Sequence, residues 1–227
     1  MKKKLFMITL AVCLIVLSIA GTSLAYFTDV EKAANVFTAG NVNIQLTYGN
    51  KTADADAENI LDAINIETRA YPGQTYKCDA AIKNVGNEAA YVGAIITVTN
   101  TNGMPSTGLT AETVMNLFTN LQKTDYTVKY AVGTDELKIY VVKDAALAAK
   151  NGDTVDSAII FDDIAIPVAW DNAEMKAFNT TKVVVQAYAT QQVGFTSAEE
   201  ALKAAFGSNN SGAWAGYATA TTSNTNG

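Results

Sequence analysis

The sequence predicts a mainly β protein, built as an antiparallel β-sandwich with a few short helices at its periphery. Several stretches alternate apolar and polar residues with the two-residue period of a half-buried strand. These stretches follow one another through turns rather than through the long crossover helices that parallel strands require. Apolar residues make up 49% of the chain, which is enough to build a core between two sheets.

The first clear strand covers residues 42–48, which alternate along their whole length. A polar loop is expected at residues 49–59. Within it, Asp54, Asp56 and Glu58 have the spacing that opens a calcium-binding loop, but the glycine and the distal glutamate of such a loop are missing. We therefore expect a solvated loop there and no metal site.

Further strands are expected along the rest of the chain, most of them separated by turn signals. The predicted ranges are 63–67, 75–83, 90–99, 126–132, 137–142, part of 158–170, and 182–193. The turns include Pro72-Gly73, Gly86-Asn87 and the hairpin signal Gly133-Thr134-Asp135. Residues 90–99 carry apolar side chains on both faces, which is typical of a central strand. Pro167 indicates an edge or the end of a strand.

Three helices are predicted from their capping residues. Thr110 precedes a run with apolar residues at helical spacing, and its hydroxyl suits an N-cap. Asp144 is expected to cap a short alanine-rich helix. Ser197 and Glu200 fit a capping box, and Gly207 fits the C′ position of the helix that follows. All three helices should lie at the periphery of the sandwich.

The N-terminus predicts secretion. Residues 2–4 are lysines, residues 5–20 form an apolar run, and small residues stand at positions −3 and −1 of a cut between Ala25 and Tyr26. These are the three parts of a secretory signal peptide. The alternative is an uncleaved membrane anchor, but the run is slightly shorter than the roughly 20 residues that a spanning helix needs.

Several short motifs, spread in order along the chain, carry a resemblance. They are Ala25-Tyr26-Phe27-Thr28-Asp29, Asn35-Val36-Phe37-Thr38-Ala39-Gly40 with the alternating Val42, Ile44 and Leu46 after it, Tyr71-Pro72-Gly73-Gln74, Lys83-Asn84-Val85-Gly86-Asn87, Gln186-Ala187-Tyr188-Ala189-Thr190-Gln191, Gly194-Phe195, and the run from Ala198 to Ala205. Together they resemble the camelysin/TasA family of bacterial secreted proteins, whose signal peptides are cut by a dedicated signal peptidase of the SipW type. Residues 102–178 carry no such motif.

The resemblance implies a fold and a function. It implies a sandwich of the jelly-roll type, and a secreted structural subunit of an extracellular biofilm matrix fibre. Proteins of this kind polymerise head to tail by donating an N-terminal strand to the next subunit. The partners so implied are further copies of the chain, the SipW-type signal peptidase and other matrix components.

The candidate donor strand follows the expected cut and consists of Tyr26, Phe27, Thr28, Asp29 and Val30. It places two aromatic residues next to a new free amine, where a soluble monomer normally carries polar residues. An open sheet edge offers them a site, since its unpaired N–H and C=O groups are a template for another chain. The alternative is that this stretch folds back as the first strand of its own chain, or frays.

The sequence thus divides into four parts. Residues 1–25 are the signal peptide, and residues 26–40 are an extended segment that holds the candidate donor strand. Residues 41–207 form the β-sandwich domain. Residues 208–227 are rich in Ser, Asn, Thr and Gly and are expected to be a flexible tail.

Charge limits the range of partners. Removal of residues 1–25 leaves 13 basic and 22 acidic residues, a net charge of −9. Such a chain is a poor ligand for nucleic acid or for anionic lipid. We therefore expect no nucleic acid partner, and contact with the membrane only before cleavage.

Cysteine is scarce. Cys13 leaves with the signal peptide, so that Cys78 remains alone and no disulfide within the mature chain is possible. Cys78 shares one strand face with Tyr76, Ala80 and Ile82. It is expected to be a small buried hydrophobic residue, the alternative being a link between chains.

No catalytic residue, metal site or cofactor is predicted. The chain has no histidine, which excludes Ser-His-Asp and Cys-His catalysis and the usual zinc sites. Asp162 and Asp163 are neighbours on a strand, so their side chains should point to opposite faces. The name camelysin carries a metallopeptidase label, but the chain lacks an H-E-x-x-H helix. A camelysin-like surface metallopeptidase and a secreted sandwich that binds cell wall or matrix sugar remain the alternatives to a fibre subunit.

Overall fold

The computed structural model describes residues 28–32, 42–49, 51–52, 70–100, 109–121, 123–178, 181–207 and 212–222. The predicted signal peptide, the strand expected at 63–67, and Asp54, Asp56 and Glu58 lie outside these ranges. None of the helices in the described ranges combines the length and the apolar character needed to cross a membrane.

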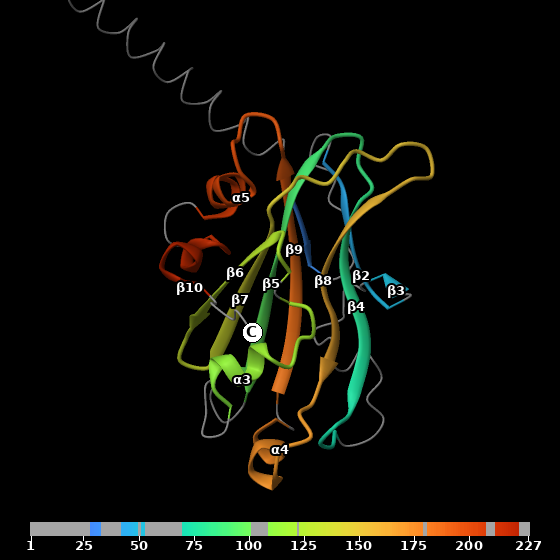
Figure 1. The fold of residues 1–227 in the computed structure, drawn as a ribbon. Coiled ribbons are helices and arrows are strands. Elements are labelled where there is room, and N and C mark those ends of the chain that lie inside the picture. Colours follow the sequence, from blue (N-terminus) through green and yellow to red (C-terminus); the bar gives the residue numbers. More distant parts are fainter. Residues whose placement is uncertain are drawn as a thin grey trace, which may run out of the picture.

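Two antiparallel sheets form the body of the protein (Figure 1). The six-stranded sheet has the order β1 (Thr28–Lys32), β9 (Thr181–Gln191), β5 (Ala90–Asn100), β7 (Glu136–Lys143), β6 (Tyr126–Val132) and β10 (Thr221–Thr222). The four-stranded sheet has the order β3 (Lys51–Thr52), β2 (Ile44–Tyr48), β4 (Thr75–Asn84) and β8 (Asp156–Ala165). The prediction of a mainly β, antiparallel sandwich is confirmed. The jelly-roll arrangement stays a prediction.

Strand β5 is central and is buried on both faces, as its sequence predicts. Val92, Ala94 and Ile96 face the four-stranded sheet and join the main core. Tyr91 and Ile95 face the other way and join a second, separate cluster. The six-stranded sheet is therefore covered on both sides, by the other sheet and by the C-terminal elements.

The three described helices lie around the sandwich. They are α3 (Ala111–Met115), α4 (Asn172–Phe178) and α5 (Ala198–Phe206). The hydroxyl of Thr110 accepts the N–H of Thr113 at 3.1 Å, which confirms the predicted cap. Helix α5 packs on the outer face of the six-stranded sheet, over β5, β7 and β9 (Figure 1).

The cap of α5 differs in part from the prediction. The Ser197 hydroxyl accepts the N–H of Glu200 at 3.2 Å, as expected. The Glu200 carboxylate, however, accepts from the N–H and the hydroxyl of Thr196 rather than from Ser197. Gly207 is the C-cap residue, with φ −100°, and not a left-handed C′ residue. Glycine is required there because a Cβ atom would lie 2.7 Å from the Lys203 carbonyl oxygen.

The prediction of a helix after Asp144 is wrong. The backbone of Leu147 forms a bridge with Ala90 instead, and the N–H of Ala148 donates to the Asp156 carboxylate at 2.8 Å. The side chain of Asn84 also holds this loop, because its amide donates to the Ala148 carbonyl at 2.9 Å. Tertiary hydrogen bonds thus override the helix propensity of the alanines.

The prediction of a flexible tail from residue 208 onward is wrong for residues 212–222. This segment contains a 3₁₀ helix, η2 (Ala215–Thr219), and the short strand β10, which pairs with β6. Trp214 and Tyr217 are fully buried against the six-stranded sheet. Their aromatic side chains explain why a segment with a tail-like composition packs in place.

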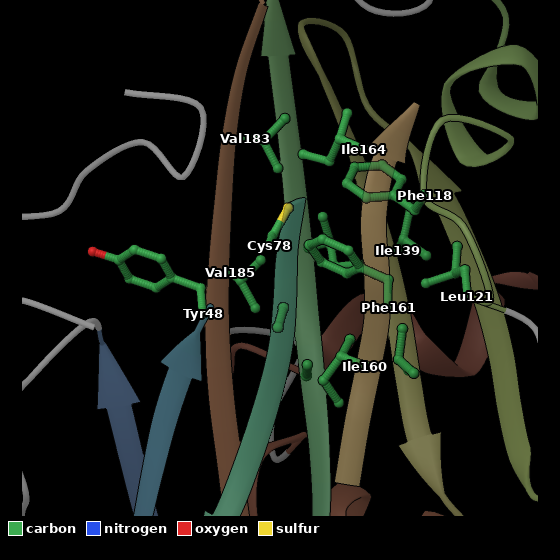
Figure 2. Close-up of a cluster of buried hydrophobic side chains, with 14 of the residues drawn as sticks. Tyr48, Cys78, Phe118, Leu121, Ile139, Ile160, Phe161, Ile164, Val183 and Val185 are labelled. Atoms are coloured by element: carbon green, nitrogen blue, oxygen red, sulfur yellow. The ribbon is translucent and has the colours of Figure 1, made fainter. Parts of the chain in front are cut away.

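Cys78 lies in the main core, on β4 and between the two sheets (Figure 2). It is a free thiol with no exposed surface. The strand bulges next to it, since Asp79 has φ +45° and the register with β8 shifts there. Burial raises the pKa of the Cys78 thiol to about 12. The prediction of a buried cysteine is confirmed.

Thiol labelling tests this placement. A buried thiol with a raised pKa presents neither surface nor thiolate to a reagent. We expect a maleimide to modify Cys78 only after denaturation, with native labelling slower by about a hundredfold or more. Fast labelling of the native monomer, followed by mass spectrometry, would contradict the structure.

Candidate strand-pairing edge

One edge of the six-stranded sheet is formed by the N-terminal strand β1, which pairs with β9 (Figure 1). The pairing is antiparallel, and its register places Thr28 opposite Thr190 and Lys32 opposite Gln186. This edge is the candidate functional site, because it receives the stretch that the sequence singles out.

The half of β9 that β1 covers is buried on both faces. Ala187 and Ala189 face the main core, and neither has exposed surface. Tyr188 faces the other way, where its ring packs edge-on against Phe206 at 5.1 Å between centroids. Because buried backbone groups need hydrogen-bond partners, the outer N–H and C=O groups of this half of β9 require a neighbouring strand.

The structure brings only part of the predicted donor strand to this edge. Thr28, Asp29 and Val30 lie in β1, opposite Thr190, Ala189 and Tyr188. Ala25, Tyr26 and Phe27 lie outside the described residues, so the cleavage site stays a prediction.

The strand continues to Glu31 and Lys32, which sequence reasoning left out of the donor strand. Two adjacent charged residues resemble a linker. The available signal was the alternation of Thr28, Val30 and Lys32, which is too short to be decisive on its own.

In the single chain, β1 pairs with β9 of the same chain. This is the self-pairing that the sequence left open as the alternative to donation. A stretch of nine residues, 33–41, connects β1 to Val42, where the next described segment begins. The strand β2, which follows, belongs to the other sheet and packs against β9.

The two neighbouring carboxylates on β8 have different partners. Asp162 accepts hydrogen bonds from Asn120 and from Lys123, the latter at 3.3 Å, and these bonds hold the pKa of its carboxyl below its usual value. Asp163 pairs with Lys77 on β4 at 2.6 Å. Across the ranges that the structure describes, no three Cys, Asp or Glu side chains gather in a way that could hold a metal ion.

No protein-family model, curated protein or solved structure matches the chain. The fold and the edge define a class, a two-sheet antiparallel sandwich in which an N-terminal strand completes one sheet. Any statement of function beyond this class rests on the residues and their geometry.

Alkaline pH tests the packing behind this edge. Burial raises the pKa of Tyr188 to about 12, whereas the pKa of the phenol in the unfolded chain is near 10.0. The stability that Tyr188 contributes is therefore fully present below pH 10 and is lost as the pH rises toward 12. We expect Tyr188 alone to lower the free energy of unfolding by roughly 1 kcal/mol per pH unit in this window.

Urea unfolding of Tyr188→Phe at several pH values gives the measurement. The fall should be less steep than in the parent chain. Part of it remains because burial also raises the pKa of other tyrosines, namely Tyr76, Tyr126, Tyr140 and Tyr217. Tyr71→Phe is the matched control, since Tyr71 is 57% exposed. If both variants lose stability at the same rate as the parent, Tyr188 is not the buried phenol described.

Proposed function

We propose that the protein is a secreted structural subunit of an extracellular fibre, in which β1 of one copy pairs with β9 of the next. The observation that carries the proposal is that β1 completes an edge whose residues are buried on both faces. Such an edge has to be covered by a strand, and that strand can come from the same chain or from a neighbour. The resemblance to the camelysin/TasA family favours the neighbour.

Secretion precedes assembly in this proposal. The signal peptide of residues 1–25 delivers the chain, and a SipW-type peptidase cuts between Ala25 and Tyr26. Until the cut, Tyr26 is tethered at the membrane, which keeps the donor strand from reaching another subunit. The net charge of −9 keeps the released subunits soluble before they pair.

Pairing within a chain and pairing between chains use the same hydrogen bonds. The balance between them is therefore set by the linker and by the subunit concentration. Residues 33–41, fully extended, span about 30 Å, which is enough to carry β1 to an adjacent molecule. An exchange of this kind is a domain swap.

The geometry of the exchange produces a filament. Each subunit gives a strand at its N-terminus and accepts a strand at β9, so donor and acceptor are different surfaces. A heterologous contact that does not close on itself propagates as an open chain. The fibre thus requires no further partner than a second copy of the protein.

A backbone change in β1 tests the proposal. In the mature chain beginning at Tyr26, the double substitution Asp29→Pro with Val30→Pro removes two adjacent N–H groups. At least one of these faces β9, because alternate N–H groups of a strand point to the same side. We expect this variant to stay folded but to form no fibres in electron microscopy and light scattering, as should a chain that lacks residues 26–35.

The control is Asp29→Ala with Val30→Ala, which keeps both N–H groups and should still assemble. Circular dichroism before and after mixing shows whether each variant keeps its β content. Fibres of equal length and number from the proline variant and from the alanine control would rule out strand donation.

A further inference from the structure

At the opposite edge of the six-stranded sheet, the C-terminal strap covers β6. The strap is defined as residues 212–222, which include η2 and β10. Within it, Thr221 pairs with Tyr130 and Thr222 with Lys129, near the middle of β6. The seven residues of β6 are mostly aromatic or β-branched. A strand of this composition at a sheet edge is a template for pairing with another chain.

The two residues of β10 cannot hold this position alone. Both are exposed, and each backbone hydrogen bond contributes only about 1 kcal/mol net. The anchoring comes from Trp214 and Tyr217, which are buried side by side with 5.3 Å between their ring centroids. The ring of Tyr140 on β7 packs against both at 5.5 Å.

Two glycines lie where the strap packs against the sheet. At Gly93 on β5, a Cβ atom would lie 2.8 Å from the Trp214 ring. At Gly216 in η2, a Cβ atom would lie 2.7 Å from the Tyr140 hydroxyl oxygen. Real Cβ atoms do not approach other atoms so closely. Both positions therefore require glycine for the strap to pack against the sheet.

A charged group joins the strap to the β6 edge and to helix α5. The ammonium group of Lys129, on β6, lies 2.7 Å from the Glu199 carboxylate of α5. The same group lies 4.3 Å above the ring of Tyr217. A lysine in the middle of an edge strand is also a recognised obstacle to pairing between chains.

The strap can open without unfolding the main core. Trp214 and Tyr217 belong to the outer cluster, which shares no residue with the cluster between the sheets. The indole N–H of Trp214 is buried and has no hydrogen-bond partner, which lowers the free energy needed to expose it. The strap is therefore a candidate for local unfolding.

We propose that the strap is an edge guard, which keeps β6 from pairing with β6 of a second copy of the chain. The occupant is a second copy because β6 already pairs antiparallel with both of its neighbours, and two such edges meet around a two-fold axis. The inference concerns a different edge from the proposed strand donation. With β6 guarded, growth in trans is confined to β9.

The test opens the guard and measures the exchange of β6 amide hydrogens at low and high protein concentration. Thr221→Pro with Thr222→Pro removes both N–H groups of β10 and leaves the aromatic anchors in place. Thr221→Ala with Thr222→Ala is the matched control, because it keeps both N–H groups. Trp214→Ala opens the strap by a second route.

In the proline variant and in Trp214→Ala, exchange in residues 126–132 should slow by about tenfold or more at high concentration. In the control it should not depend on concentration. If both opened variants exchange in β6 at the same rate at every concentration, the guard proposal is wrong. Circular dichroism verifies that each variant keeps its β content.

A second readout separates this inference from strand donation. Pairing within a chain and pairing between chains protect the same β9 amides, so donation is read from fibre formation in electron microscopy, which should be equal in the control and the opened variants. Failure of donation would leave every chain without fibres and would leave the β6 effect in the opened ones.

Discussion

The outer edge of β9 is the constraint on which the rest of the structure depends. Between Ala187 and Thr190 this strand has almost no exposed surface, because the second sheet covers one face and helix α5 the other. Its backbone groups can find partners only along the edge. The hydrogen bonds that β1 supplies therefore stabilise this edge, and the strand that supplies them can belong to the same chain or to a neighbouring copy.

The six-stranded sheet is closed at both ends by a chain terminus, but in different ways. At β9 the N-terminal strand contributes a ladder of five residue pairs. At β6 the C-terminal strap contributes two pairs and is held by buried aromatic rings. A ladder of backbone bonds transfers readily to another molecule, whereas a fitted aromatic anchor does not. The difference in chemistry matches the roles proposed for the two edges.

Much of the fold could be predicted from the sequence, because alternation and capping are local signals. The strand ending at Tyr48 and the Thr110 cap needed only their own neighbours. The helix after Asp144 failed because Leu147 is held by Ala90, far away in the sequence. The packing of residues 212–222 was missed because the Ser, Asn, Thr and Gly content was given more weight than the two aromatic residues, Trp214 and Tyr217. At the candidate edge, Thr28 to Val30 were identified, but cis and trans pairing share one pattern and no sequence signal separates them.

The most direct measurement mixes two singly substituted mature chains, D29C and A189C, under oxidising conditions. Residues 29 and 189 face each other in the ladder, and directly opposite Cα atoms lie about 4.5–5.5 Å apart, within reach of a disulfide. The account predicts a disulfide between the two chains in non-reducing mass spectrometry, and none when A189C is replaced by the out-of-register K182C. A disulfide that forms only when D29C and A189C are on the same chain would show that β1 pairs with β9 of its own chain, and would contradict strand donation.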